Sequence, residues 1–205
     1  MINIDKEKVY ESHGYKFKNF ICLTDSEKEM VLRWRNHDKV RSMMVNKDII
    51  PLEDHLAFIE GLKQRDDCSY WLVSDPNGVN VGVFDVIHIN MEEDVGETGY
   101  YLNQDEAGKG FEFMIECNYF VYHQLKMKYN LVTIDLNNRE ILLFGLYLNI
   151  SFEGIKEIEG VKYLYNNHIT GDYILKHYDE FSLKDYARFI KLHKNDKVLY
   201  NILKL

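Results

Sequence analysis

The stretch ETGYYLNQDEAGKGFEFMIE, at residues 97–116, is the part of the sequence that decides the fold. Its first six residues read as a strand, and a helix is predicted from residue 111 to about residue 126. The loop between them holds Gly108 and Gly110. Strand, glycine loop and helix form a phosphate-binding arrangement, because glycine lets backbone N–H groups approach a pyrophosphate and the helix adds about half a positive charge there. A plain tight turn is the alternative.

The residues before this stretch predict three strands and two helices of an α/β protein. A first strand is expected over residues 15–23. Asp25 with Ser26 is then expected to cap a helix that runs to Val40, and Pro51 to open a second helix as its first residue.

A hairpin follows, with strands over residues 70–74 and 79–90 joined by the turn Asp-Pro-Asn-Gly at 75–78. Proline presets the backbone angle in such a turn, and Asn-Gly tolerates the left-handed conformation.

The residues after the stretch predict a strand at 129–136 and a helix at 138–149, and then strands at 152–158 and 171–178 with a final helix at 182–193. Antiparallel hairpins first and a crossover later predict a mixed twisted sheet flanked by helices, an α/β fold. No linker or repeat divides the 205 residues. We therefore expect one domain over 1–205, with its core at about 16–178 and a helical extension over 179–205.

Composition excludes several classes of protein. A net charge of −8 argues against a general nucleic-acid binder, which would need a basic face. The apolar runs are too short to span a bilayer, and the first residues lack the apolar core of a secretory signal, so we expect a cytoplasmic protein away from membranes. The three cysteines are widely separated, which favours free thiols and no metal site.

The segment Gly108-Lys109-Gly110 resembles the end of the acetyl-CoA-binding motif Q/R-x-x-G-x-G/A of the GNAT superfamily of N-acetyltransferases. Asp105 stands where the family has Gln or Arg. The resemblance implies the GNAT (acyl-CoA N-acyltransferase) fold, with acetyl-CoA as cosubstrate. It assigns cofactor binding to Tyr101, Leu102, Asn103, Ala107, Gly108, Lys109, Gly110 and Asn138.

The segment LYLNISF at 146–152 resembles a second GNAT signature, L-Y-x-x-x-G-F, with Ser151 in place of glycine. Tyr147 then matches the family tyrosine that protonates the CoA thiolate, although a core aromatic is the alternative. Asn138 resembles the asparagine that opens this helix, but it lies nine residues before Tyr147 rather than the usual seven. Either the insertion lies in the preceding loop or Asn138 is not equivalent.

Aminolysis of a thioester also needs a proton acceptor and a donor to the carbonyl oxygen. The family places a backbone N–H donor on the strand over residues 98–102. Glu97 is the first candidate for the proton acceptor and Asp85 the second, and the alternative is that each is a solvated strand residue.

The segment LRWRNHDKVRSMMVNKDIIPLEDHLAFIEGL at 32–62 resembles the GNAT branch that acetylates nucleotide-linked amino sugars. It is similar to the acetyltransferases of pseudaminic acid biosynthesis, which act on the 4-amino group of UDP-4-amino-4,6-dideoxy-N-acetyl-β-L-altrosamine. The resemblance implies that Arg35 and His55 contact the diphosphate. It also implies an apolar sugar or base pocket lined by Met43, Met44 and Phe58, with His88 as a further candidate.

Two other functions stay open at this point. A GNAT enzyme that acetylates a protein N-terminus shares an early WRN-like motif. A non-catalytic acyl-CoA-binding module is suggested by Asp105, Ser151 and the shifted Asn138. A homodimer is left open.

Overall fold

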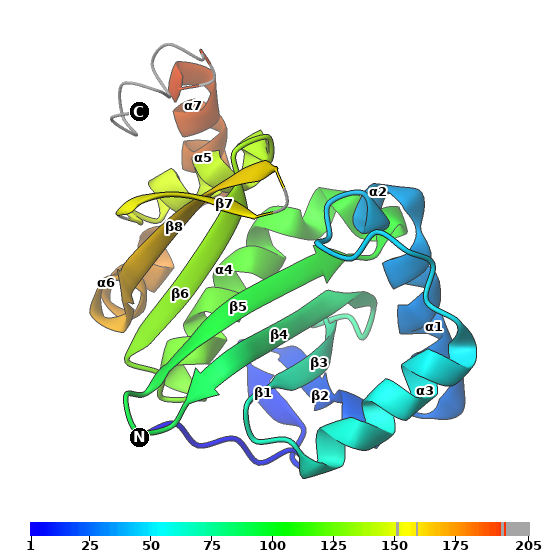
Figure 1. Cartoon of the computed structure of the whole chain (residues 1–205). Coiled ribbons are helices and arrows are strands. Elements are labelled where there is room, and N and C mark those ends of the chain that lie inside the picture. Colours follow the sequence, from blue (N-terminus) through cyan, green and yellow to red (C-terminus); the bar gives the residue numbers. More distant parts are fainter. Residues whose placement is uncertain (151, 159, 194, 196–205) are drawn as a thin grey trace.

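One mixed sheet organises the part of the chain that the computed structural model describes, residues 1–150, 152–158, 160–193 and 195. Its eight strands lie in the order β1-β2-β3-β4-β5-β6-β8-β7 (Figure 1). Every neighbouring pair is antiparallel except β5 and β6, which are parallel. The strands are β1 Tyr10–Ser12, β2 Tyr15–Asn19, β3 Ser69–Ser74, β4 Asn80–Asn90, β5 Val95–Leu102, β6 Tyr129–Asp135, β7 Gly154–Ile158 and β8 Val161–Thr170.

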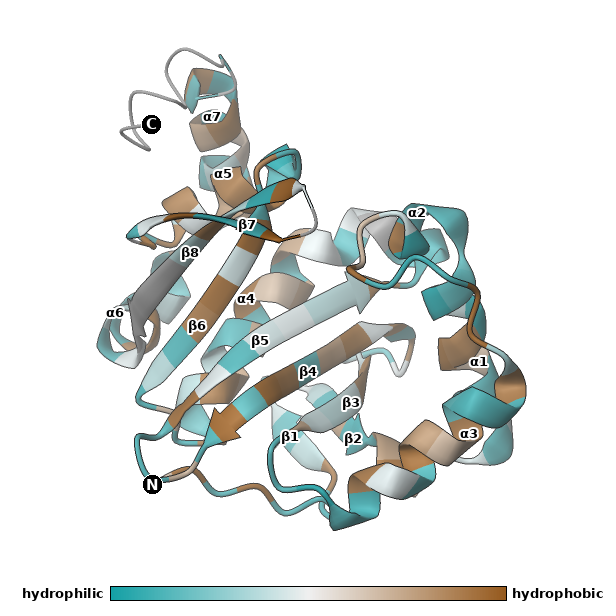
Figure 2. Ribbon diagram, in the orientation of Figure 1, coloured by the Kyte–Doolittle hydropathy of each residue, from teal (hydrophilic) through white to brown (hydrophobic). Residues whose placement is uncertain are grey.

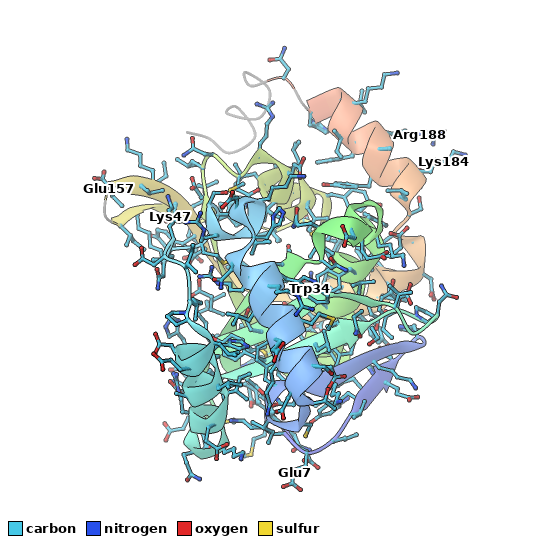
Figure 3. The ribbon with its side chains drawn as sticks, turned by 90° about the vertical axis from the view of Figure 1, so that its right-hand side faces the viewer. Glu7, Trp34, Lys47, Glu157, Lys184 and Arg188 are labelled. Carbon is cyan, nitrogen blue, oxygen red and sulfur yellow. The ribbon has the colours of Figure 1, made fainter. Side chains whose placement is uncertain are left out.

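Helices cover both faces of this sheet. α1 and α3 share a core with β3 and β4 on one face, whereas α4, α5, α6 and α7 contribute to the core on the other. Figure 3, turned by 90° from Figure 1, shows α3 and α7 on opposite sides of the molecule. The helices are α1 Asp25–Asn36, α2 Asp38–Arg41, α3 Leu52–Gly61, α4 Gly110–His123, α5 Arg139–Tyr147, α6 Gly171–His177 and α7 Leu183–His193, with short 3₁₀ turns η1 Phe20–Cys22, η2 Leu62–Gln64, η3 Gln104–Lys109 and η4 Tyr178–Glu180.

The two cores follow from the alternation of side chains along the strands. On β4, Phe84 and Val86 belong to the core under α4, and Val83 belongs to the core under α1 and α3. Figure 2 shows apolar residues in brown along this central strand. Asp85 therefore shares its face of the sheet with Val83, toward α1 and α3.

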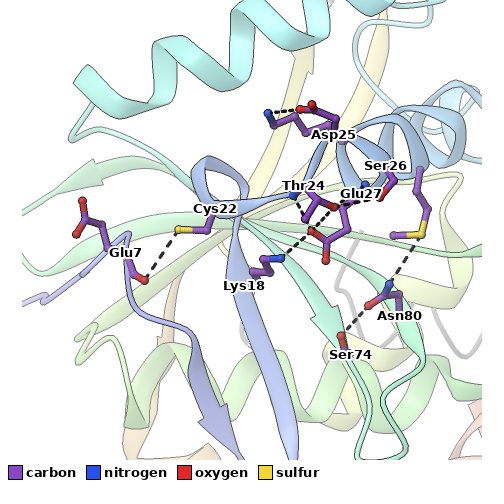
Figure 4. Close-up of polar contacts among 11 residues, drawn as sticks. Glu7, Lys18, Cys22, Thr24, Asp25, Ser26, Glu27, Ser74 and Asn80 are labelled. Atoms are coloured by element: carbon purple, nitrogen blue, oxygen red, sulfur yellow. Dashed lines mark hydrogen bonds and ion pairs between the residues drawn. The ribbon is translucent and has the colours of Figure 1, made fainter.

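A capping box fixes the start of α1 (Figure 4). The Thr24 side chain accepts from the Glu27 N–H at 3.3 Å, and the Glu27 carboxylate accepts from the Thr24 N–H at 2.7 Å. Lys18 on β2 pairs with Glu27 at 2.7 Å, which ties the helix to the sheet. The predicted cap at Asp25 and Ser26 was thus off by about one residue. The extended backbone of His37 also ends α1 before Val40.

The N-terminal part of the sheet begins earlier than predicted. The expected strand over residues 15–23 is β2 at Tyr15–Asn19 followed by a 3₁₀ turn, and β1 precedes it. His13 and Gly14 join β1 to β2 with φ values of 46° and 84°, the left-handed pair that a two-residue hairpin turn requires. The expected core boundary near residue 16 was therefore too late.

The strand predicted over residues 171–178 was wrong, because this segment forms α6 and η4. The strand beside β6 is β8, Val161–Thr170. Ile174 is fully buried in the core with α4, and a side chain at Gly171 would lie 2.6 Å from the Tyr122 ring of α4. Close packing of this segment on α4 therefore favours a helix.

A buried carboxylate on α4 connects the first hairpin of the chain to the segment that follows α6. Glu116 lies 3.1 Å from Nδ1 of His13 in the first hairpin, and it accepts a 2.6 Å hydrogen bond from the Tyr178 hydroxyl after α6. Burial, together with Glu116, raises the pKa of Tyr178. The rings of His13 and Tyr178 stack at 4.3 Å.

Candidate active site

The most unusual feature of the sheet is the parting of its two parallel strands. β5 pairs with β6 over residues 95–97, and over residues 98–102 its pairing in the described chain is with β4 alone. Figure 1 shows the two strands diverging from that point. The edge of β5 that faces β6 is thus left without a strand partner along its second half.

Antiparallel alternation tells which backbone groups lie on that edge. The Asn103 N–H donates to the Val81 carbonyl of the β4 segment at 2.9 Å. Residues of an antiparallel ladder alternate between bonding to the partner and pointing away from it. Thr98, Tyr100 and Leu102 therefore direct their N–H and C=O groups toward the side that β6 leaves. Of the predicted cofactor residues on this strand, Leu102 points to the parting, and the backbone groups of Tyr101 and Asn103 point to β4.

Asn130 lies where the two strands part, opposite Gly96. Its Nδ2 donates to Thr98 Oγ1 at 2.8 Å. Its Oδ1 is buried and has no hydrogen-bond partner within the described residues. A buried acceptor without a donor is costly, so this amide can accept a hydrogen bond from a ligand in the parting.

The glycine loop leads from the end of β5 into α4. Among the described residues, no atom lies within 4 Å of a Cβ built on Gly108, and a Cβ on Gly110 would lie 3.1 Å from Leu102 Cδ1. Open space at Gly108 gives a ligand access to the backbone there. Lys109 at the N-cap position of α4 makes no side-chain capping hydrogen bond within the described residues, so it does not satisfy the first N–H groups of the helix. Ala107, between these glycines and the strand, lies in η3.

The side chain of Lys109 serves the loop itself. Its ammonium group pairs with Asp75 at 2.8 Å and with Glu106 at 2.9 Å. Asp75 also accepts from the N–H groups of Asn77 and Val79 in the β3–β4 turn, and Lys109 lowers the pKa of Asp75. Lys109 thus joins two loops and is not a free cation for a phosphate.

Asp85 lies at the middle of β4, opposite Tyr70 on β3 and Gly99 on β5. A Cβ on Gly99 would lie 2.8 Å from Asp85 Oδ1, so the missing side chain makes room for this carboxylate. Burial raises the pKa of Asp85 to about 7, and the Glu97 carboxylate adds to the shift. A carboxyl group that titrates near neutrality is suited to accept a proton in catalysis.

Glu97 lies on the same face, at the last residue where β5 pairs with β6. Its Oε2 is 3.2 Å from Nδ1 of His88. The Glu97 side chain is 23% exposed and that of His88 is 72% exposed. Glu97, our first candidate for the base, is thus partly exposed, as Asp85 is.

Arg35 closes the other end of this face from the last turn of α1. Its Nη2 donates to the Asn46 carbonyl at 2.8 Å, and its Nη1 is buried without a hydrogen-bond partner in the described chain. Burial lowers the pKa of Arg35. Burial also raises the pKa of Tyr101, and the positive charge of Arg35 opposes part of that increase. A guanidinium with an unpartnered buried N–H favours an anion.

The loop after α2 carries the two predicted methionines. Asn36 holds this loop by exchanging two 2.9 Å hydrogen bonds with the backbone of Ile50. Met43 is exposed and Met44 partly buried. Both are therefore available to an acceptor bound near Arg35.

The two predicted residues of α3 lie in different settings. Phe58 is exposed, with its ring 5.2 Å from that of Tyr70, the neighbour of Asp85. His55 is only 5% exposed, and its Nε2 lies 3.1 Å from the Lys28 carbonyl of α1. Burial lowers the pKa of His55. The position of His55 is that of a packing residue and gives no support to the predicted diphosphate contact.

Tyr147 ends α5 and lies under the C-terminal segment. Its hydroxyl is 3.3 Å from the backbone N–H of Ser182, which donates to it, and 3.4 Å from the Ser182 carbonyl. The rings of Phe111, Phe181, Tyr186 and Phe189 surround its ring at centroid distances of 5.1 to 6.0 Å. The phenol is therefore close to the start of α4, with its hydroxyl bonded to the segment before α7.

Asn138 caps α5, because its side chain accepts from the Ile141 N–H. The helix is continuous from Arg139 to Tyr147, so no loop separates Asn138 from Tyr147. Nine residues turn a helix by about two and a half turns, which places Asn138 and Tyr147 on opposite faces. The side chain of Asn138 therefore does not project from the same face of the helix as Tyr147, as the family spacing of seven residues would require.

Sequence reasoning missed Tyr70, Gly99 and Asn130. The strand register decides which residues flank Asp85, and that register is not readable from the sequence of one strand. One sequence signal was available for Gly99, because a glycine inside a strand often marks a place where another group approaches the backbone closely. Among the described residues, no group of three or more His, Cys, Asp or Glu could hold a metal ion, and no helix is long and apolar enough to cross a membrane.

The chain is similar in sequence to curated acetyltransferases, including two of Campylobacter jejuni. Acetyltransferase PseH of Campylobacter jejuni subsp. jejuni serotype O:23/36 is 31% identical over 127 residues, which cover 62% of this chain and 78% of that protein. Acetyltransferase PseH of serotype O:2 is 33% identical over 112 residues, which cover 55% and 69%. No family model matches.

Solved structures share the fold. The crystal structure of Campylobacter jejuni N-acetyltransferase PseH in complex with acetyl coenzyme A is similar, with a TM-score of 0.57 and 24% identity, over 75% of this chain and 98% of that one. Spermidine N-acetyltransferase from Vibrio cholerae, solved with CoA and spermine, has a TM-score of 0.63 and 16% identity, over 78% and 99%. The mixed sheet with its parted strands is thus an acetyltransferase fold.

Proposed function

The chain belongs to the PseH acetyltransferases of the GNAT superfamily, and we propose that it transfers the acetyl group of acetyl-CoA to the 4-amino group of a UDP-linked 4-amino-4,6-dideoxy sugar. UDP-4-amino-4,6-dideoxy-N-acetyl-β-L-altrosamine is the acceptor that the sequence resemblance implies. A relative of the same name has been solved with acetyl coenzyme A.

The parting of β5 and β6 is the observation that carries this proposal. Over residues 98–102 it leaves one edge of β5 without a strand partner in the described chain, between the face that holds α4 and the face that holds Asp85 and Arg35. In the proposal the acetyl donor binds along this edge from the α4 side and the acceptor binds from the Asp85 side. Acetyl-CoA supplies an acyl group activated as a thioester. The chain has to bind and orient it, accept one proton from the amine and donate one proton to the sulfur.

The α4 face fits acetyl-CoA. Within the described residues, the N–H and C=O groups of Tyr100 and Leu102 lie beyond the last pair of β5 with β6, and they match the amide groups of an extended pantetheine arm, as a strand would. The open backbone at Gly108 and the N-terminus of α4 suit the pyrophosphate. Ala107 and Gly110 flank this position. One of the strand N–H groups can also donate to the thioester carbonyl oxygen as charge develops on it.

Gly108→Val tests this half of the site. Its side chain would enter space that no protein atom occupies, so the fold should persist while acetyl-CoA binds at least about tenfold more weakly, roughly 1.4 kcal/mol. Gly61→Val on α3 is the matched control, because that glycine also has no atom within 4 Å of its Cβ position. Calorimetry measures both affinities. Equal affinity in the two variants would rule out the assignment of Gly108.

The Asp85 face fits the sugar nucleotide. The unpartnered Nη1 of Arg35 can donate to the diphosphate. Met43, Met44 and Phe58 offer apolar surface to the methyl group of the deoxysugar or to the base. His55 enters this proposal only if it leaves its contact with Lys28.

Arg35→Ala should raise the KM for the sugar nucleotide by roughly tenfold, with the KM for acetyl-CoA nearly constant, because it removes binding to one substrate only. Arg33→Ala is the control, since Arg33 is an exposed arginine of the same helix. Steady-state kinetics with each substrate varied in turn gives both constants. Equal weakening of both substrates would contradict the proposed division of the site.

The chemistry needs one base and one acid. Asp85 accepts the proton of the amine as the new N–C bond forms, and Tyr147 donates a proton to the sulfur as the C–S bond breaks. The position of Tyr147 close to the start of α4 is compatible with this role, provided that its hydroxyl leaves Ser182. A cytoplasmic location and a homodimer remain predictions.

The direct test is to incubate the purified chain with acetyl-CoA and the UDP-4-amino sugar. We expect release of the CoA thiol together with a product heavier by one acetyl group. A sugar nucleotide with a hydroxyl at C4 should give neither. Faster turnover on a peptide with a free N-terminal amine, or acetyl-CoA binding without thiol release, would replace this proposal by one of the two alternatives.

A further inference from the structure

β4 loses its regular geometry at His88, near the end of the strand. The pairing with β5 shifts register between Ile87 and Asn90. His88 itself has a φ of 52°, in the left-handed region that non-glycine residues rarely adopt. Bulges of this kind redirect a side chain that the regular alternation would send to the other face.

The redirection brings His88 to Glu97. In a regular strand, residue 88 would share the face of Phe84 and Val86, away from Asp85. Instead, Nδ1 of His88 lies 3.2 Å from Oε2 of Glu97. Glu97 is on the same face of β5 as Gly99, the partner of Asp85, and its carboxylate acts electrostatically on Asp85. The three side chains therefore form a row along the sheet.

The row reaches solvent at His88. Asp85 is the member that burial affects most, the Glu97 side chain is 23% exposed, and the His88 side chain is 72% exposed. An imidazole can take up and release a proton near neutral pH, which suits the outer position.

We propose that Glu97 and His88 carry the proton that Asp85 receives from the amine out to solvent. This rests on the proposed function. As the N–C bond forms and the C–S bond breaks, Asp85 gains the amine proton and Tyr147 gives its own to the thiolate. The Asp85 proton passes to Glu97, then to the imidazole of His88, and from there to water. Tyr147 regains its proton from solvent.

The other groups coupled to Asp85 do not offer this route. They are Tyr70 on β3, Tyr101 on β5 and Cys117 on α4. Burial raises the pKa of all three, so each keeps its proton near neutral pH. Within the described chain, Glu97 is the one carboxylate that acts on Asp85.

His88→Ala in a dilute buffer without imidazole tests the relay. We expect kcat to fall by roughly three- to tenfold with both KM values unchanged, and added imidazole to restore kcat. If His88 instead contacts the sugar nucleotide, as the sequence suggested, its loss should raise the KM for that substrate and leave kcat unchanged. His177→Ala is the matched control, because His177 forms a similar pair with Glu180 at 2.8 Å, on α6.

Glu97→Gln tests the middle step of the relay. In a relay, the double variant Glu97→Gln with His88→Ala should be no slower than the slower single variant, whereas independent roles would multiply the losses. An unchanged kcat in His88→Ala, a raised acceptor KM, or multiplied losses would each overturn the relay. Failure of the proposed function would appear differently, as a wild-type chain that does not acetylate the sugar nucleotide.

Discussion

Replacing Asp85 by asparagine is expected to lower turnover by roughly 10²- to 10⁴-fold, the scale usual for loss of an acid or base catalyst. Asparagine keeps the size of the side chain, so the room beside Gly99 stays filled and the fold should be unchanged. It cannot accept the amine proton. Single-turnover measurement of thiol release, with both substrates saturating, gives the rate of the chemical step.

The pH profile gives this prediction a second readout. Because the pKa of Asp85 is raised to about 7, kcat/KM of the wild type should rise as pH passes through about 7, where the carboxylate forms. Asp85→Asn should lose this inflection. Asp66→Asn, an exposed carboxylate between η2 and β3, should keep both rate and profile. A wild-type inflection retained in Asp85→Asn would assign the titration to another group.

Stability should move in the opposite direction. The folded pKa of Asp85 lies above the value of about 3.9 for an unfolded aspartate, so the folded state binds more protons between these values. Stability contributed by the neutral carboxyl is therefore present below about pH 4 and is lost as pH rises to about 7. Thermal melts should show Asp85→Asn gaining Tm over the wild type as pH rises. A less stable and inactive variant would instead indicate misfolding.

Tyr147→Phe is expected to lower turnover by roughly ten- to a thousandfold, less than the full range for acid catalysis because water can substitute. Phenylalanine keeps the ring that Phe111 and Tyr186 contact, so acetyl-CoA affinity should barely change. Rate measurements under conditions where chemistry limits turnover test the role. Tyr119→Phe on α4 is a control that removes a hydroxyl elsewhere.

A different result would assign the hydroxyl to structure. The Ser182 N–H and carbonyl both contact it, so a purely structural phenol would give full turnover and a lower Tm when lost. Tyr147 would then not have the role of the family tyrosine as proton donor to the CoA thiolate. The opposite directions of Asn138 and Tyr147 on α5 would be the physical reason, since the helix that presents the acid differs from that of the family.

Local patterns predicted most of the central sheet. The Asp-Pro-Asn-Gly turn fixed the β3–β4 hairpin, and the glycine loop correctly led from β5 into α4. The sequence was misread where packing decides. Residues 171–178 are helical because α6 packs on α4, and the segment at 161–170 forms a strand because β6 and β7 flank it.

The sequence named candidate site residues but not how they are assembled. Asp85, Glu97, Arg35 and Tyr147 were named as candidates, and their roles stay predictions. Desolvation raises the pKa of Asp85, and this places Asp85 before Glu97 as the candidate base. The contact of His55 with the Lys28 carbonyl removes the support for its predicted role. Asn130 gains its position from the pairing of β5 with β6, two strands that α4 separates in the sequence. No local spacing contains that information.

The position of Glu116 has a consequence for the order of folding. Its partners are His13 and Tyr178, which are 165 residues apart in the chain, and both must be present for the buried carboxylate to be fully bonded. During synthesis, α4 emerges with only the first of them available. Closing such a long loop is slow, so the native core around α4 should be completed late, after residue 178 has left the ribosome. Until then a nascent chain carries a half-satisfied carboxylate in its core, and chains that stop short of Tyr178 should be prone to chaperone binding and proteolysis.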